Sequence, residues 1–363
     1  MIEKYFGRQR IPAKFVAIPA FLALCVLAMS ISSAPVLEYD LTLAARFGTF
    51  LLSILIQAFP FLLAGTLLSS VIGEFVPRGA IERLLGTSPV IAVPASILCA
   101  FLFPVCDCAS VPVAARLAER KVPPSAVVTF MLSSPIINPV VVLSTIYAFP
   151  ENRSFVWARV IIGVAVPVIA GLVIQRIFSR SATGIIVSKD HHAHEHDGHS
   201  CSCGHCDDHH EHGAHDQIHD SITQRIMRTL AHTGEEFVGV MPYIIAGATV
   251  SAVLQTVIPK NALASFGTGA GLAAQTLVMM AAAFLLSVCS TSDAFIARGF
   301  LFTFAPAPVL AFMAAGPMID LKNVLMMTPY FRKRFIIALI CLIFILISAS
   351  AAVFSLIVQG GIR

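Results

Sequence analysis

Long apolar stretches alternate with short polar breaks along most of the chain. About 20 apolar residues are enough to cross the hydrocarbon core of a bilayer as a helix. Stretches of that length predict membrane helices at about residues 15–33, 46–72, 125–148, 156–177, 235–258, 302–327 and 335–358. This pattern indicates an all-α integral membrane protein. A cleaved signal peptide is the alternative for residues 15–33, because basic residues precede that stretch.

Two further apolar stretches, residues 89–103 and 271–287, are too short to cross. A helix of about 15 residues spans only ~22 Å, against ~30 Å of hydrocarbon. Each stretch is followed at once by a polar run, Cys106-Asp107-Cys108 in the first and Cys289-Ser290-Thr291-Ser292-Asp293 in the second. We therefore expect both to turn inside the membrane as re-entrant or broken-helix hairpins, in a fold of roughly seven to nine membrane helices.

The second half of the chain repeats the first at an offset of 182 residues. The matched pairs include Pro60 with Pro242, Gly65 with Gly247, Ser110 with Ser292, Arg116 with Arg298 and Pro135 with Pro317. Chance matching of apolar residues does not explain aligned Gly, Pro, Ser and Arg over ~90 residues. Each copy holds one crossing, one hairpin and two further crossings. An odd number of crossings predicts that the second copy is inverted relative to the first, which is typical of transporters.

Basic clusters predict the orientation and the domain organisation. The cluster from Lys4 to Lys14 places the N-terminus in the cytoplasm, and later clusters fall on the same side only if the short stretches turn back. We divide the chain into an N-terminal tail with the first helix, a first membrane repeat, a hydrophilic insertion and a second membrane repeat. The ranges are 1–42, 43–177, 178–231 and 232–363.

The composition excludes a soluble domain of this size. Hydrophobic residues make up 57% and charged residues 12% of 363 residues, and the mean hydropathy is +0.85. The lipid bilayer is therefore the expected surrounding. The net charge of +4 is modest and no basic patch carries interleaved aromatic residues, so no nucleic acid is expected as a partner. No Gly-x-x-x-x-Gly-Lys-[Ser/Thr] run occurs, which favours coupling to protons or to a partner protein over ATP.

The two hairpin breaks carry the side chains with the most chemistry. Thiolates are soft ligands, and a carboxylate near the bilayer centre costs about 2.5–3.5 kcal/mol, which marks it as a functional candidate. The candidate transport residues there are Cys106, Asp107, Cys108, Ser110, Cys289, Ser292 and Asp293. The alternative is that each aspartate pairs with a nearby arginine, Arg116 or Arg298. Cysteines elsewhere in the membrane, such as Cys99 and Cys341, are interpreted as small apolar fillers.

A second break follows in each repeat and matches Asn138 with Asp320. Unwound backbone and half-helix ends at such breaks can offer carbonyl oxygens or dipoles to a substrate. Both residues are therefore added to the candidate transport site. A simple proline kink is the alternative.

The insertion is a candidate metal-binding segment. Eleven of the twelve histidines lie between His191 and His219, and imidazole, thiolate and carboxylate groups at short spacing suit Zn(II), Cu or Ni(II). The candidate ligands are His191, His192, His194, His196, His199, Cys201, Cys203, His205, Cys206, His209, His210 and His212. No zinc-finger spacing is present, so we expect an unstructured segment that collects, senses or buffers metal. No cofactor is required for the membrane part.

The hairpin sequences resemble one family of permeases. The runs Phe-Pro-Val-Cys-Asp-Cys-Ala-Ser-Val-Pro, Ser-Ser-Pro-Ile-Ile-Asn-Pro and Ser-Val-Cys-Ser-Thr-Ser-Asp-Ala-Phe are similar to those of the predicted-permease family that includes the ArsP-like organoarsenical efflux permeases. The resemblance implies a bacterial inner-membrane permease, with efflux of trivalent organoarsenicals in some members. It also implies that Cys106, Cys108 and Cys289, which match motif positions, take part. The His-rich insertion departs from the family's usual pattern and favours a transition metal over an arsenical as the substrate.

The leading hypothesis is a secondary transporter that exports a soft metal or metalloid species through a thiol-lined site. Its partners would be a small inorganic or organometalloid solute and a soluble metal-delivery protein. A membrane thiol enzyme or sulfur-group carrier is a second hypothesis, although it needs an activating base and the membrane segments contain no histidine. Uptake of a sulfur-containing anion, and metal sensing without transport, are further alternatives.

Overall fold

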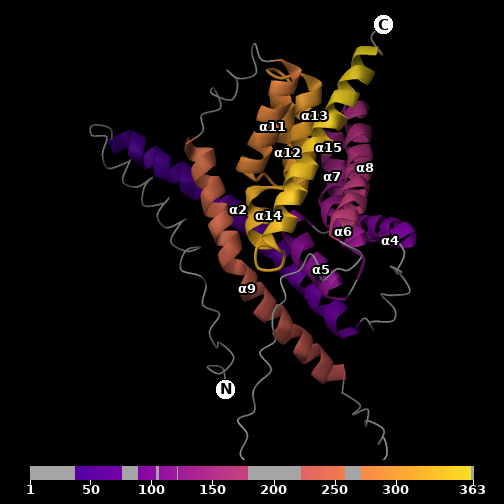
Figure 1. Ribbon diagram of the computed structural model, residues 1–363. Coiled ribbons are helices and arrows are strands. Elements are labelled where there is room, and N and C mark those ends of the chain that lie inside the picture. The colour runs from indigo at the N-terminus through magenta and orange to yellow at the C-terminus, as the bar shows by residue number, and fades with distance from the viewer. Residues whose placement is uncertain are drawn as a thin grey trace, which may run out of the picture.

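The computed structural model describes residues 37–75, 89–103, 106–120, 122–178, 222–257 and 271–360. Within these ranges the chain forms α-helices and no β-strand (Figure 1). The expected first helix at 15–33 and the candidate metal ligands of the insertion lie outside the described residues. The all-α fold expected from the hydropathy pattern is confirmed for the part that is described.

The described part of the first repeat contains six helices. They are α2 (Leu37–Phe75), α4 (Pro89–Leu102), α5 (Asp107–Glu119), α6 (Pro124–Ile137), α7 (Pro139–Ala148) and α8 (Arg153–Ile177). The second repeat, where the structure describes it, contains six helices in the same order. They are α9 (Ile222–Val257), α11 (Leu272–Leu286), α12 (Asp293–Phe300), α13 (Pro306–Met318), α14 (Leu321–Met327) and α15 (Lys333–Gly360).

The helix boundaries follow the sequence repeat. Helices α6 and α13 begin at Pro124 and Pro306, and α7 and α14 begin at Pro139 and Leu321, each pair 182 positions apart. The packing between the copies is also reciprocal, because α5 contacts α14 and α12 contacts α7. Such an exchange is expected of two copies related by a pseudo-two-fold axis. The internal repeat is therefore a repeat of structure as well as of sequence.

Six helical spans are long and apolar enough to cross a membrane within the described residues. They are Ala44–Phe75, Pro124–Ala148, Arg153–Ile177, Arg225–Val257, Pro306–Met327 and Lys333–Ile357. These coincide with six of the seven stretches expected from the sequence. Helix α9 begins at Ile222, ten residues before the expected start of the second repeat at 232. The extra turns contain both polar and apolar residues and pack on the end of α2, where Arg228 lies 3.7 Å from Glu74.

The two short apolar helices end at the expected polar breaks. Helix α4 has 14 residues and α11 has 15, which gives lengths of about 21 and 22 Å, too short to cross the hydrocarbon. Helix α5 begins directly after Cys106, whose backbone is extended. After α11 it turns through Ser287, which has a left-handed backbone with φ of 46°, and continues as α12. Each hairpin thus ends in a polar tip followed by a second short helix.

The interior of the protein is formed by the two spans that are themselves broken. In the spans Pro124–Ala148 and Pro306–Met327, 78% and 83% of the most apolar window is buried, against 28% in Lys333–Ile357. Helices α2, α8 and α15 instead expose large apolar side chains such as Ile56, Ile161 and Ile345, as expected of surfaces that face lipid. Polar groups of the hairpin tips therefore lie in the protein interior, away from hydrocarbon.

Two equivalent glycines let the long helices approach the interior closely. A Cβ atom placed on Gly65 of α2 would lie 2.3 Å from the Cβ of Ala109 in α5. A Cβ atom placed on Gly247 of α9 would lie 2.9 Å from the Cα of Lys322 in α14. Each long helix therefore packs, at matching positions, on the short helix of its own repeat that borders the hairpin tips.

Candidate functional site

A cavity of about 200 Å³ lies where the two hairpin tips meet. Its walls come from both repeats: the middle of α2, the start of α5, the end of α9, the turn between α11 and α12, and α14. The lining residues are Phe50, Ser53, Ile54, Gln57, Ala58, Phe61, Cys106, Asp107, Cys108, Gln255, Ser287, Val288, Cys289, Ser292, Ile296 and Lys322. The three hairpin cysteines singled out from the sequence thus line one cavity.

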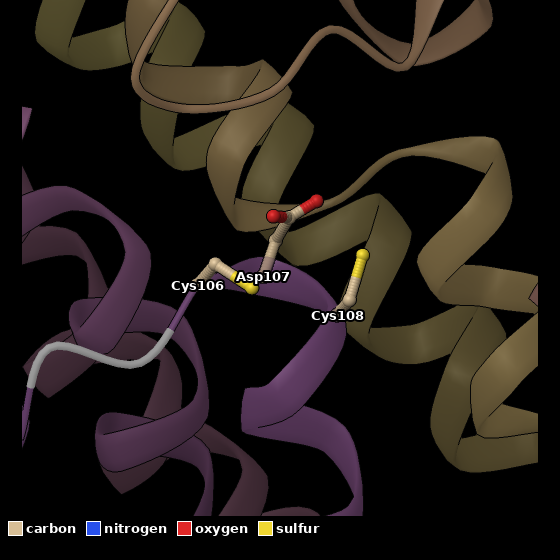
Figure 2. Close-up of side chains that lie close together, drawn as sticks. All are labelled: Cys106, Asp107 and Cys108. Atoms are coloured by element: carbon tan, nitrogen blue, oxygen red, sulfur yellow. The ribbon is translucent and has the colours of Figure 1, made fainter. Parts of the chain in front are cut away.

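The first tip presents two thiols and a carboxylate to this cavity. Ligand atoms of Cys106, Asp107 and Cys108 all lie within 4.8 Å of one another, and the three residues are buried (Figure 2). Cys106 is the N-cap of α5 and Asp107 is in its first turn, so the positive end of the helix dipole lies at the tip. The arrangement suits a soft cation held by sulfur with one oxygen ligand.

Only one of the two carboxylate oxygens of Asp107 has a hydrogen-bond partner among the described residues. Its Oδ2 atom accepts a hydrogen bond of 2.8 Å from the Nζ atom of Lys322 in α14. Its Oδ1 atom has no hydrogen-bond partner among the described residues, although the side chain is almost fully buried. A buried carboxylate oxygen without a partner is costly, which makes it a candidate for binding a ligand in the cavity.

Lys322 is a site residue that the sequence reasoning missed. Its side chain is 4% exposed and lies 2.8 Å from Asp107 and 3.5 Å from Asp320. The signal was present in the sequence, because a lysine inside the apolar stretch 302–327 is as unusual as an aspartate in a hairpin. Lys322 therefore lies between two buried carboxylates, of which only Asp107 lines the cavity.

The second tip contributes Cys289 and Ser292 to the cavity. The Sγ atom of Cys289 lies 3.5 Å from the Oγ1 atom of Thr291, and the Ser292 hydroxyl donates to the Cys289 carbonyl at 3.2 Å. Ser110, the counterpart of Ser292 in the first repeat, does not line the cavity. Its hydroxyl donates to the Asp107 carbonyl at 2.8 Å and so braces the first turn of α5.

Asp293 is buried in a separate ion pair and does not line the cavity. Two nitrogens of Arg159 in α8 bind its two carboxylate oxygens at 3.0 and 2.6 Å. Arg159 also donates to the Thr145 hydroxyl at 3.0 Å and to the Ser290 carbonyl at 3.4 Å. This network ties the second hairpin tip to the first repeat. Arg159, like Lys322, was missed although it lies in a predicted crossing.

The arginines expected as alternative partners of the aspartates take other contacts. Arg116 lies 3.1 Å from Glu119 and 3.8 Å from Glu236, and Arg298 donates to the Ala148 carbonyl at 2.9 Å. The pairing of each aspartate with a nearby arginine is therefore wrong. The partners come instead from the opposite repeat, because the hairpin tips meet across the interface between the two copies.

The residues at the second breaks are helix caps. The Asn138 side chain accepts from the Val140 N–H at 3.0 Å at the start of α7. The Asp320 side chain accepts from the Asn323 N–H at 2.6 Å at the start of α14. Asn138 does not line the cavity, whereas Asp320 reaches it indirectly through Lys322. Asn138 and Asp320 thus share a structural role as helix caps. Only Asp320 also contacts a charged residue that lines the cavity, Lys322.

The sequence from residue 43 to residue 356 matches the protein family described as a predicted permease. The chain belongs to this family. The permease is 37% identical over 315 residues to the UPF0718 protein YcgR of Bacillus subtilis. That alignment covers 87% of the chain and 97% of the relative. The permease is also 34% identical over 286 residues to a Streptococcus mutans protein named as a subunit of a two-component membrane permease complex. That alignment covers 79% of the chain and 87% of the relative. No solved structure matches the permease.

Family membership and the helical spans together identify a multi-pass membrane permease. They favour a transporter over an enzyme. The residues that bind cargo, and the metal ligands of the insertion, stay predictions.

Proposed function

We propose that this permease exports a soft metal or metalloid species through the cavity at the hairpin tips. The observation that carries the proposal is that three thiols from two repeats, with Asp107, line one cavity. Cys106 and Cys108 come from the first repeat and Cys289 from the second. A solute gripped by all three would be held between the two halves that must move in alternating access.

The chemistry of the site favours thiophilic cargo. Cd(II), Cu(I) and Zn(II) bind thiolates, and Asp107 Oδ1 is placed to add an oxygen ligand. A trivalent arsenical with two hydroxyl groups would bind two thiols. Each As–S bond forms as an arsenic–oxygen bond breaks, and the departing hydroxyl leaves with the thiol proton as one molecule of water. The oxidation state of arsenic is unchanged, so the step is reversible, as release of a transported solute requires.

A membrane thiol enzyme is less well supported than a transporter. A cysteine nucleophile needs an activating base nearby. Within the described part of the chain, no histidine lines the cavity.

An anionic sulfur solute is also less well supported. Lys322 is held by two carboxylates at 2.8 and 3.5 Å, so its charge is already compensated and does not favour such a solute.

A polar contact closes the two repeats against each other away from the cavity. Glu236 of α9 accepts from Ser69 of α2 at 3.2 Å and lies 3.8 Å from Arg116 of α5. On α2 the cavity is lined by Phe50 to Phe61, whereas Ser69 lies two further turns along the same helix. Rocking of one repeat against the other would break this contact and open the site to that side. In the orientation that the basic clusters predict, this side would be the cytoplasmic face.

The remaining parts of the proposal concern delivery and location. The His/Cys-rich insertion, on the cytoplasmic side of a bacterial inner membrane, would collect Zn, Cu or Ni for export or report its concentration. The S. mutans relative is named as one subunit of a two-component complex. A second protein that delivers metal or completes the path is therefore part of the proposal.

Resistance and accumulation in a sensitised host test this function. The panel is Zn, Cu, Ni, Co, Cd, arsenite, antimonite and methylarsenite. Cells with the wild-type permease are expected to exclude one of these, and cells with Cys106→Ser/Cys108→Ser to accumulate it. The matched control is Cys99→Ser/Cys341→Ser, since neither of those thiols lines the cavity. Equal accumulation in cells with the two double variants would refute the proposal.

A further inference from the structure

We propose that Lys322 is a tethered cation that exchanges between Asp107 and Asp320, so that loading of the thiol site releases an ion pair that joins the two repeats. This inference rests on the proposed function, because it requires a cationic cargo at the thiols. It adds a coupling residue to the site and a reason why cargo and movement are linked.

The geometry provides two carboxylates for one ammonium. The Nζ atom of Lys322 lies 2.8 Å from Asp107 Oδ2 and 3.5 Å from Asp320 Oδ2. The Oδ2 atom of Asp320 has no hydrogen-bond partner among the described side chains and backbone, although Asp320 is fully buried. An approach of 0.7 Å, from 3.5 to 2.8 Å, would make the second contact as short as the first. The exchange therefore needs only a small side-chain movement.

The two pairings differ in what they connect. Asp107 belongs to α5 of the first repeat, whereas Asp320 and Lys322 belong to the start of α14 in the second. Pairing with Asp107 joins the repeats, and pairing with Asp320 stays within one. The backbones on both sides are fixed, because Gly65 packs on α5 and Gly247 packs on α14 at Lys322 itself. The exchange thus makes or breaks a link between two rigid parts.

A cargo cation would compete with Lys322 for Asp107. Ligand atoms of Asp107 and the two neighbouring thiols lie within 4.8 Å of one another, so a cation bound by the thiols would also contact this carboxylate. Two cations on one buried carboxylate repel strongly at the low effective dielectric of the interior. The ammonium would then move to Asp320. In the empty site it neutralises Asp107, which would otherwise be an unpaired buried charge.

The test measures binding of Cd(II) to the purified full-length permease. The background carries Cys201→Ser, Cys203→Ser and Cys206→Ser, so that sulfur-to-cadmium charge-transfer absorption reports only thiols outside the insertion. The variants are Lys322→Met, Asp320→Asn and their combination, and Lys333→Met, at an exposed position, is the control. Asparagine keeps the cap of α14, as Asn138 caps α7 at the matched position.

We expect the two single substitutions to act in opposite directions. Lys322→Met removes the competing cation and should tighten cadmium binding by about tenfold or more, within the usual range of coupling between linked sites. Asp320→Asn removes the carboxylate to which the Lys322 ammonium would move, and it should weaken cadmium binding by about the same factor. The combined variant should bind like Lys322→Met, because no ammonium remains to be displaced. A lysine with a merely structural role would weaken binding in both single variants.

The outcomes separate this inference from the function on which it rests. If cadmium absorption is the same in the background protein and in its Cys106→Ser/Cys108→Ser variant, the thiol site and the lysine exchange are both refuted. If absorption depends on those thiols but not on Lys322 or Asp320, only the exchange is refuted. Should Lys322→Met fail to fold, Asp320→Asn decides alone, since unchanged affinity in that variant overturns the proposal.

Discussion

Replacement of Arg159 by methionine is expected to destabilise the permease severely. Arg159 is 1% exposed and binds Asp293 through two contacts of 3.0 and 2.6 Å. It also donates to Thr145 and to the Ser290 carbonyl. Arg159→Met removes all of these bonds and leaves the Asp293 carboxylate buried without a cation. The substitution keeps a long side chain, so that the loss is mainly electrostatic.

The size of the effect follows from the burial of both partners. Removing one member of a buried ion pair costs about 3–5 kcal/mol, because the other charge is left uncompensated. Replacing both members by apolar residues of similar volume is often nearly neutral. Arg159→Met/Asp293→Leu should therefore recover most of the stability that Arg159→Met loses. Because each single substitution costs about 3–5 kcal/mol and the double substitution costs little, the coupling energy should be about 5 kcal/mol or more. The average for polar contacts between membrane helices is only ~0.6 kcal/mol.

Unfolding by sodium dodecyl sulfate in mixed micelles, followed by circular dichroism, measures these differences. The double-mutant cycle compares the wild type, the two single variants and the double variant. Arg153→Met, at the exposed first residue of α8, is the control for loss of an arginine. A coupling energy below ~1 kcal/mol would refute the ion pair as a structural clamp. Loss of transport in a fully stable double variant would return Asp293 to the list of transport residues.

Three further substitutions or deletions give predictions of different size. Gly65→Ala should cost about 1–3 kcal/mol in the same unfolding assay, because the new methyl group meets Ala109, whereas Gly48→Ala, with nothing within 4 Å, should not destabilise. Asn138→Ala removes the cap of α7 and should cost about 1 kcal/mol; unchanged stability would contradict that role. Deletion of residues 190–219 should reduce but not abolish resistance to the exported metal, and complete loss in a protein that still reaches the membrane would favour metal sensing over transport.

The membrane helices and hairpins could be predicted because their signals are local. Hydropathy over about 20 residues decides a crossing, and a shorter run cannot span the hydrocarbon whatever surrounds it. The repeat was visible because glycine and proline serve backbone needs that other residues do not meet. Gly65 and Gly247 show the need directly, since each lies where two helices approach too closely for a side chain. Local rules thus predicted the described elements and their order.

The partners of the buried aspartates could not be predicted in the same way. Lys322 binds Asp107 across 215 positions, and Arg159 binds Asp293 across 134. Such pairs depend on how the two repeats meet, which no spacing rule gives. The prediction that the nearest arginines pair with the aspartates was wrong. Arg116 instead contacts Glu119, and Arg298 donates to the Ala148 carbonyl. A charge inside an apolar stretch was the usable signal, and it marked both missed residues.

Transport by the purified permease in proteoliposomes tests the thiol cavity most directly. Vesicles with the wild-type protein, with Cys106→Ser/Cys108→Ser or with Cys99→Ser/Cys341→Ser receive cadmium or methylarsenite on one side, and mass spectrometry measures the amount that crosses. The account predicts crossing of at least one soft species with the wild type and with the second double variant, and only background leakage with the first. Equal crossing with all three proteins would contradict the claim that the hairpin thiols form the transit site.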